Sequence, residues 1–327
     1  MFHREPVRLR SDQNRRAETW ERGNRGRSNR CCGDDSCHHE AVDGERVEFE
    51  GFEGLRLVAD VWGESDAWPV LLLHGGGQTR HAWGSTAERV ASQGWRTVAL
   101  DLRGHGDSQW APNRDYSFTA FGGDVVAVVD QLGKPPVLVG ASLGGMSALL
   151  AEGTSDRTVS CGLVLVDITP KTNDVGIQRI RTFMESGLGG FDTLEEAADA
   201  IAEFTPQRTR RVNPSGLAKV LRQREGRWFW HWDPAFIGQG RTEVVPDRLA
   251  GLLEVAVNNI DVPTMLVRGL LSDVVDQEGV DHFKASMPEA KVVNVAGASH
   301  MIAGDRNDVF SDAVVTFLRD EILPTVS

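Results

Sequence analysis

The sequence predicts an α/β fold in which a mostly parallel sheet is flanked by helices and carries a helical cap insertion. Short, continuous apolar runs such as residues 70–73 alternate with stretches of helical period. Runs of that kind are typical of parallel strands that are buried on both faces. The alternation stops at about residues 169–257 and then resumes, which indicates a cap inserted after the fourth parallel strand.

The individual elements follow from their periodicity. Residues 46–51 and 55–62 alternate with period two, which predicts an antiparallel hairpin at a sheet edge. Buried strands are predicted over residues 70–73, 97–100, 136–141, 162–166, 264–267 and 291–295. Helices are predicted over residues 85–92, 118–132, 275–286 and 308–321, and a further helix runs on from Ser142.

The chain divides into a polar N-terminal segment and one folded domain. Residues 1–44 hold nine arginines and eight acidic residues and almost no periodic apolar pattern. Such a segment cannot bury enough apolar surface to offset the entropy lost on ordering. We therefore expect a disordered N-terminal extension over residues 1–44 and a domain over residues 45–322, with the cap at about residues 169–257.

Three of the four cysteines, Cys31, Cys32 and Cys37, lie in that extension beside two histidines. Their spacing is not the paired C-x-x-C pattern of strong zinc motifs, so no metal is predicted, although a zinc cluster is the alternative to a disordered tail that contains cysteines. Cys161 opens an apolar run and is expected to be a small buried hydrophobic residue. No cofactor is predicted.

The formal net charge of -12 argues against nucleic acid as a partner, because phosphate binding needs a basic footprint. No apolar run approaches the roughly 18 residues of a membrane-spanning helix. The polar N-terminus lacks the apolar segment of a secretory signal, and none follows the Arg15–Arg16 pair. These observations favour a cytoplasmic enzyme, and they do not predict its oligomeric state.

The most informative motif is Gly140-Ala-Ser142-Leu-Gly144, which occurs once, where an apolar strand ends and a helix begins. A G-x-S-x-G sequence in that context predicts a tight strand-to-helix turn that exposes the serine as a nucleophile. The two glycines are needed because side chains at those positions would collide with neighbouring backbone. The sequence therefore predicts Ser142 as the nucleophile of acyl transfer.

The turn His74-Gly-Gly-Gly77 directly follows the strand at residues 70–73. Acyl transfer passes through a tetrahedral oxyanion, which backbone N–H groups can stabilise, and a glycine-rich turn lets the backbone approach the substrate. We expect the amides of Gly76 and Leu143 to form this oxyanion hole, and His74 to be structural.

A serine nucleophile needs a base and an acid that orients it. Of the nine histidines, His300 follows the last predicted strand and so lies at the carboxyl edge of the sheet, as Ser142 does. Asp273 follows the preceding predicted strand, and the chain order Ser, Asp, His fits this class of hydrolase. The predicted acid is Asp273, with Asp167 and Asp276 as alternatives.

These motifs together resemble the α/β-hydrolase superfamily, in the branch of bacterial esterases and cofactor-free haloperoxidases. The resemblance implies the α/β-hydrolase fold, a triad of Ser142, Asp273 and His300, and a structural role for His105. Epoxide hydrolases and haloalkane dehalogenases of this superfamily have an aspartate in place of Ser142, so those chemistries are disfavoured. The matching pieces are residues 73–78, 101–108, 140–145, 268–273 and 297–300.

The predicted function is carboxylic-ester hydrolysis of a small ester-like substrate. The same triad could serve a C–C bond hydrolase, a thioesterase, a lactonase or a perhydrolase, and a non-catalytic ligand-binding relative is a third possibility. In the cap, Trp228 and Trp230 belong to an aromatic run that predicts either a wall of the acyl pocket or packing of the cap on the core.

Overall fold

The computed structural model describes residues 44–205, 213–237, 246–300 and 307–326, which belong to one compact unit. Its centre is an eight-stranded mixed sheet, in which β1 and β2 form an antiparallel hairpin at one edge and the other six strands are parallel. This confirms the predicted α/β fold with its mostly parallel sheet. In spatial order the strands are β1 (Glu45–Glu50), β2 (Arg56–Trp62), β4 (Arg96–Leu100), β3 (Pro69–Leu73), β5 (Val137–Ala141), β6 (Gly162–Val166), β9 (Thr264–Gly269) and β10 (Lys291–Val295).

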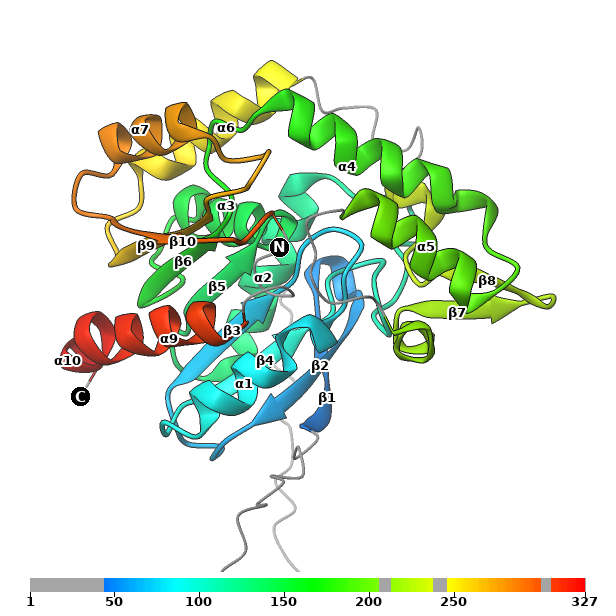
Figure 1. Ribbon diagram of the computed structural model, residues 1–327. Coiled ribbons are helices and arrows are strands. Elements are labelled where there is room, and N and C mark those ends of the chain that lie inside the picture. Colours follow the sequence, from blue (N-terminus) through cyan, green and yellow to red (C-terminus); the bar gives the residue numbers. More distant parts are fainter. Residues whose placement is uncertain (1–43, 206–212, 238–245, 301–306, 327) are drawn as a thin grey trace, which may run out of the picture. The chain divides into compact units, whose positions relative to one another are not determined.

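Helices cover both faces of the sheet (Figure 1). Alternate residues of one strand belong to different apolar clusters: Leu71 and Leu73 pack with α2 and α3, whereas Val70 and Leu72 pack with α1 and α9. Burial on both faces explains why these strands read as unbroken apolar runs. The helices are α1 (Gly84–Ala91), α2 (Phe118–Leu132), α3 (Leu143–Thr154), α6 (Pro246–Asn258), α7 (Gln277–Ser286), α9 (Asn307–Phe317) and α10 (Leu323–Val326), with a π-helical turn at Leu318–Ile322.

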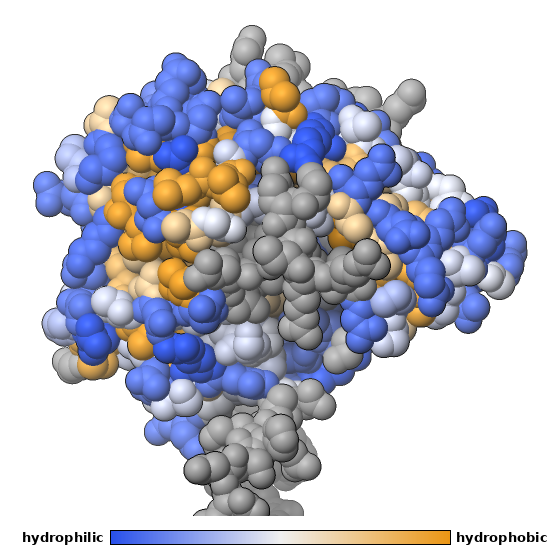
Figure 2. Space-filling view, in the orientation of Figure 1, coloured by the Kyte–Doolittle hydropathy of each residue, from blue (hydrophilic) through white to orange (hydrophobic). Residues whose placement is uncertain are grey.

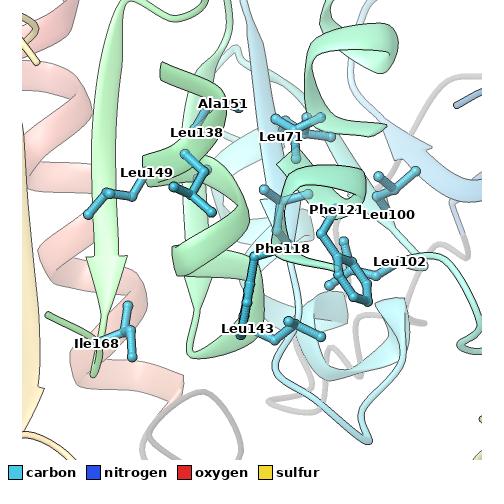
Figure 3. Close-up of a cluster of buried hydrophobic side chains, with 14 of the residues drawn as sticks. Leu71, Leu100, Leu102, Phe118, Phe121, Leu138, Leu143, Leu149, Ala151 and Ile168 are labelled. Atoms are coloured by element: carbon cyan, nitrogen blue, oxygen red, sulfur yellow. The ribbon is translucent and has the colours of Figure 1, made fainter. Parts of the chain in front are cut away.

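Figure 3 shows the larger of these clusters, in which leucine and phenylalanine side chains fill the space beside α3. Leu138 on β5 and Leu143 at the start of α3 both contribute to it and are at most 3% exposed. The helix after the predicted nucleophile is therefore fixed to the sheet by its own apolar side chains. Figure 2 shows that the visible surface is largely hydrophilic, with apolar side chains gathered on the side where Figure 1 draws β10.

The cap lies between β6 and β9, as predicted. Helix α4 (Asp174–Ser186) runs along the carboxyl edge of the sheet. The backbone of Gly176 abuts the carbonyl of Asp273 at one end, and Met184 contacts Gly77 at the other (Figure 1). Helix α5 (Leu194–Phe204) and the hairpin of β7 (Leu221–Arg224) and β8 (Arg227–Trp230) follow.

The sequence analysis predicted a helical cap and did not predict this hairpin within it. Its two-residue turn, Glu225-Gly226, has φ values of 50° and 81°, the left-handed conformation that a tight hairpin requires. The predicted extension at residues 1–44 and its cysteine cluster lie outside the described residues, except for Gly44. Cys161 is described, and it is only partly buried.

Candidate active site

Ser142 occupies the tight turn between β5 and α3 that the sequence predicts. Its backbone has φ 46° and ψ −111°, a conformation that non-glycine residues rarely adopt. A Cβ on Gly140 would lie 2.4 Å from the carbonyl oxygen of Gly144, and a Cβ on Gly144 would lie 2.3 Å from that of Leu73. Both glycines are therefore required for the strand and the helix to approach so closely.

Asp167 directly follows β6, just as Ser142 directly follows β5. The two strands are parallel and pair Ala141 with Val166 in register, so that the next residue on each is Ser142 or Asp167. The amide of Ser142 donates to the carbonyl of Val166 at 3.1 Å. Asp167 also has a positive φ, of 50°. The side chains of Ser142 and Asp167 thus emerge from neighbouring strand ends at the carboxyl edge of the sheet, where open α/β sheets place their sites.

Asp167 is the acid that contacts His300. Its Oδ2 lies 2.7 Å from His300 Nδ1, and its side chain is fully buried whereas that of His300 is 11% exposed. The same carboxylate accepts the amide of Gly269 at 3.0 Å and the hydroxyl of Ser272. Three donors compensate for burying the charge. Because a carboxylate only accepts, Nδ1 carries the imidazole proton and Nε2 is left as the basic nitrogen.

Asp273 does not approach His300, and the prediction that it orients the base is wrong. Its side chain is 39% exposed and forms an ion pair of 2.6 Å with Arg179 on the cap helix α4. The two valines that follow it are fully buried, which turns the Asp273 side chain to the outside of the loop. The other alternative, Asp276, caps the N-terminus of α7.

The loop after β3 places its amides beside Ser142. A Cβ on Gly75 would lie 3.6 Å from Ser142 Cβ, and one on Gly76 would lie 3.9 Å from Leu143 Cδ2. Among the described residues, the backbone N–H groups of Gly76 and Leu143 have no hydrogen-bond partner. The Leu143 side chain is 3% exposed and packs in the apolar core (Figure 3). These are the two amides that the sequence analysis named for an oxyanion hole, and that role stays a prediction.

Two buried histidines hold that loop. His74 Nε2 accepts the amide of Leu102 at 3.0 Å, and its Nδ1 donates to the carbonyl of Gly75 at 2.8 Å. Burial lowers the pKa of His74 to about 3, so the ring is neutral. His105 Nε2 accepts the amide of Gly77 at 3.1 Å. Both rings are hydrogen-bonded to backbone groups, and they therefore stabilise the loop after β3.

The cap tryptophans pack on the larger apolar cluster, and two of them stack on each other. Trp230 is 7% exposed, stacks on Trp232 at a centroid distance of 4.8 Å and meets Phe191 edge-on. Trp228, on the same strand, is partly buried and pairs through its backbone with Phe191. Trp232 is the tryptophan that reaches the loop after β3, at 3.2 Å from the position of a Cβ on Gly77. The sequence pointed to Trp228 and Trp230 instead, because the alternation of a strand does not show which ring lies over this loop.

The described residues include no group of three His, Cys, Asp or Glu side chains arranged to hold a metal ion. In the same part of the chain, no helix has both the length and the apolar character needed to cross a bilayer.

Known proteins resemble this chain in sequence and structure. The model of the alpha/beta hydrolase family matches residues 70–313. The chain is 28% identical to esterase Rv0045c of Mycobacterium tuberculosis, with 83% of this chain and 89% of the relative covered. It is 27% identical to the sn-1-specific diacylglycerol lipase ABHD11 of Mus musculus, with 78% and 82% covered.

Solved structures agree with this. A structure of the same mycobacterial esterase superposes with a TM-score of 0.67 at 26% identity, and 85% of this chain and 93% of that one are covered. The crystal structure of E-2-(acetamidomethylene)succinate hydrolase superposes with a TM-score of 0.73 at 19% identity, and 84% and 99% are covered. The second similarity shows a shared fold only. Esterases and lipases are thus among the distant relatives of this chain.

Proposed function

We propose that this chain, which belongs to the alpha/beta hydrolase family, is a serine hydrolase that cleaves small carboxylic esters. Ser142 is the nucleophile, His300 the general base and Asp167 the acid that orients it. The observation that carries the proposal is the 2.7 Å hydrogen bond between His300 and Asp167, at the same sheet edge as the Ser142 turn. The relatives named as an esterase and a lipase support the ester as the substrate class.

In the first half of the reaction, Ser142 Oγ attacks the ester carbonyl carbon and His300 Nε2 takes the hydroxyl proton. Asp167 holds the imidazole in the tautomer with the proton on Nδ1 and stabilises the imidazolium that forms. The tetrahedral intermediate collapses, His300 returns the proton to the alkoxide leaving group, and an acyl-serine remains. Water then attacks the acyl group by the same route and releases the acid.

The negative charge that develops on the carbonyl oxygen is held by the amides of Gly76 and Leu143. Both N–H groups lack a partner in the described residues and lie beside Ser142. Leu143 is also the first residue of α3, so the positive end of the helix dipole adds to the stabilisation. Loss of one such donor costs about 10²–10³ in turnover in comparable sites.

The test is hydrolysis of short p-nitrophenyl esters and labelling by a fluorophosphonate probe. We expect the wild type to turn over the ester and to be labelled at Ser142, and Ser142→Ala to lose both. Ser147→Ala is the matched control, because Ser147 lies on the same helix with its hydroxyl bonded to the Leu143 carbonyl. Turnover by Ser142→Ala, or labelling of another residue, would contradict the proposal.

A further inference from the structure

A polar hollow of about 460 Å³ is lined by residues of β1, β2, the loop after β4 and the cap strand β7. The chain as a whole is acidic, with 35 lysines and arginines against 47 acidic residues. The hollow has the opposite character, because four arginines and a single carboxylate line it. Its charged and aromatic lining residues are Arg46, Arg56, Arg222, Arg224, Asp107 and Trp110.

Asp107 is shared among several guanidinium groups. Its carboxylate lies 3.0 Å from Arg46, 2.5 Å from Arg222 and 3.1 Å from the buried Arg80. Partial burial works to raise the pKa of Asp107, but these three cations outweigh it and lower the pKa to about 2. One carboxylate cannot neutralise them. Arg46 and Arg222 therefore keep unsatisfied N–H groups, and their side chains are 54% and 46% exposed.

Arg224 has no acidic partner among the described residues. Its guanidinium carbon lies over the ring of Trp110, 5.0 Å from the centroid, and the guanidinium N–H groups have no hydrogen-bond partner among the described residues. Arg224 and Arg222 are two positions apart on β7, so they extend from the same face of the strand. Two oriented guanidinium groups thus point to one side of the hairpin.

The other charged groups near the hollow do not cancel the positive charge of its arginines. Arg56 pairs with Glu48 at 2.9 Å and also donates to the carbonyl of Asp107 at 3.1 Å. When Glu48 and Asp107 are set against the four lining arginines, two positive charges remain. His231 also lines the hollow, and burial lowers its pKa to about 3, so it is neutral and adds no charge.

We propose that this hollow binds a phosphate group, presented as the monoester of a small molecule or of a lipid headgroup. A phosphate monoester carries close to two negative charges at neutral pH, which matches the excess. Planar guanidinium forks donate paired hydrogen bonds to phosphate oxygens, and all four cations are arginines. The site is distinct from Ser142: His231 separates the two, donating from Nε2 to the carbonyl of Gly77 at 3.2 Å and accepting the amide of Gly106 at 2.7 Å.

Calorimetric titration with inorganic phosphate and with glycerol 3-phosphate tests the proposal in the full chain. We expect saturable binding that weakens with added salt, and at least a tenfold loss of affinity in Arg224→Gln and in Arg222→Gln. Arg157→Gln is the matched control, because Arg157 is equally exposed and pairs with Asp130 away from the hollow. Arg224 forms no ion pair, so its variant should fold even if Arg222→Gln does not.

Sedimentation with vesicles that contain phosphatidic acid, compared with phosphatidylcholine alone, separates a lipid headgroup from a soluble phosphate. Binding of either form that Arg224→Gln weakens and Arg157→Gln leaves unchanged supports the site. The proposal is overturned if neither form binds at concentrations up to roughly 10 mM, or if Arg224→Gln and Arg157→Gln behave alike. Neither result depends on esterase activity.

Discussion

His300 is hydrogen-bonded to Asp167, a residue 133 positions earlier in the chain and one strand away from the nucleophile. This contact joins the loop after β10 to the end of β6 across the intervening strand β9. Strand β9 contributes as well, because the amide of Gly269 at its end donates to the same carboxylate. Three neighbouring strand ends therefore converge on one buried charge.

Replacing each aspartate by asparagine should show whether Asp167 or Asp273 orients His300. We expect Asp167→Asn to lower kcat by roughly 10⁴-fold, because an asparagine amide can donate to the imidazole and favour the wrong tautomer. Asp273→Asn should cost less than about tenfold, since Asp273 pairs with Arg179 in an exposed position. The two kcat values are measured with one ester at one pH. A larger loss in Asp273→Asn would show that the acid acts from the other loop.

The strained backbone at residue 142 should be visible in stability. Alanine keeps the φ of 46° unfavourable, whereas glycine adopts it freely. We expect Ser142→Gly to have a free energy of unfolding about 1 kcal/mol higher than Ser142→Ala, measured by urea denaturation. The alanine variant is the reference because both variants lack the hydroxyl. Equal stabilities would mean that the turn relaxes when the serine is removed.

Glycines of the turn should tolerate no side chain. In Gly140→Ala the new Cβ would lie 2.4 Å from a backbone oxygen, so we expect a loss of about 1–3 kcal/mol or more in the free energy of unfolding. Gly251→Ala is the control: it lies on α6 with nothing within 4 Å of a Cβ, and helix propensity predicts a gain of about 0.5–1 kcal/mol. Thermal and urea unfolding of the two variants would reveal opposite signs.

His231 should make the fold sensitive to acid. Burial lowers its pKa from 6.5 to about 3 in the folded state, so below about pH 6.5 the unfolded chain binds a proton that the folded chain does not. Its contribution to stability is thus complete above that pH and is lost as the pH falls toward 3. Between about pH 7 and pH 5 we expect the wild type to lose about 2 kcal/mol more than His231→Gln. Parallel losses in the two proteins would refute this.

Much of the site could be predicted because it is encoded locally. The Ser142 turn depends on five consecutive residues, two of which must be glycine because a Cβ there would collide with neighbouring backbone. The position of His300 could be predicted because this residue follows the last strand of the sheet. The amides of Gly76 and Leu143 adjoin those same elements, and their role as an oxyanion hole stays a prediction.

The acid could not be chosen in this way, because Asp167 and Asp273 both follow parallel strands. The choice depends on which of them meets the His300 loop, and that is a tertiary contact. One local signal favoured Asp167: it comes directly after its strand, as Ser142 does, whereas Asp273 precedes the apolar pair Val274-Val275, which occupies the interior. The role of Ser272 in binding Asp167 had no signal in the sequence.

The cap hairpin was missed for another reason. Its strands are four residues each, too short for a clear alternation among charged and aromatic side chains. The Glu225-Gly226 turn was the available signal, since a glycine after a polar residue is typical of a two-residue hairpin loop. The proline residues around it pointed to irregular structure instead.

The donors that surround Asp167 are made later in synthesis than Asp167 itself, since all three follow it in the chain. Gly269, Ser272 and His300 all come from the last sixty or so residues of the chain, whereas the nucleophile lies before its midpoint. A growing polypeptide can complete β5 and the Ser142 turn long before β9 and β10 have emerged to join the sheet. Until they do, Asp167 lacks the donors that hold it beside His300, so under the proposed function the nascent chain has a serine without an oriented base.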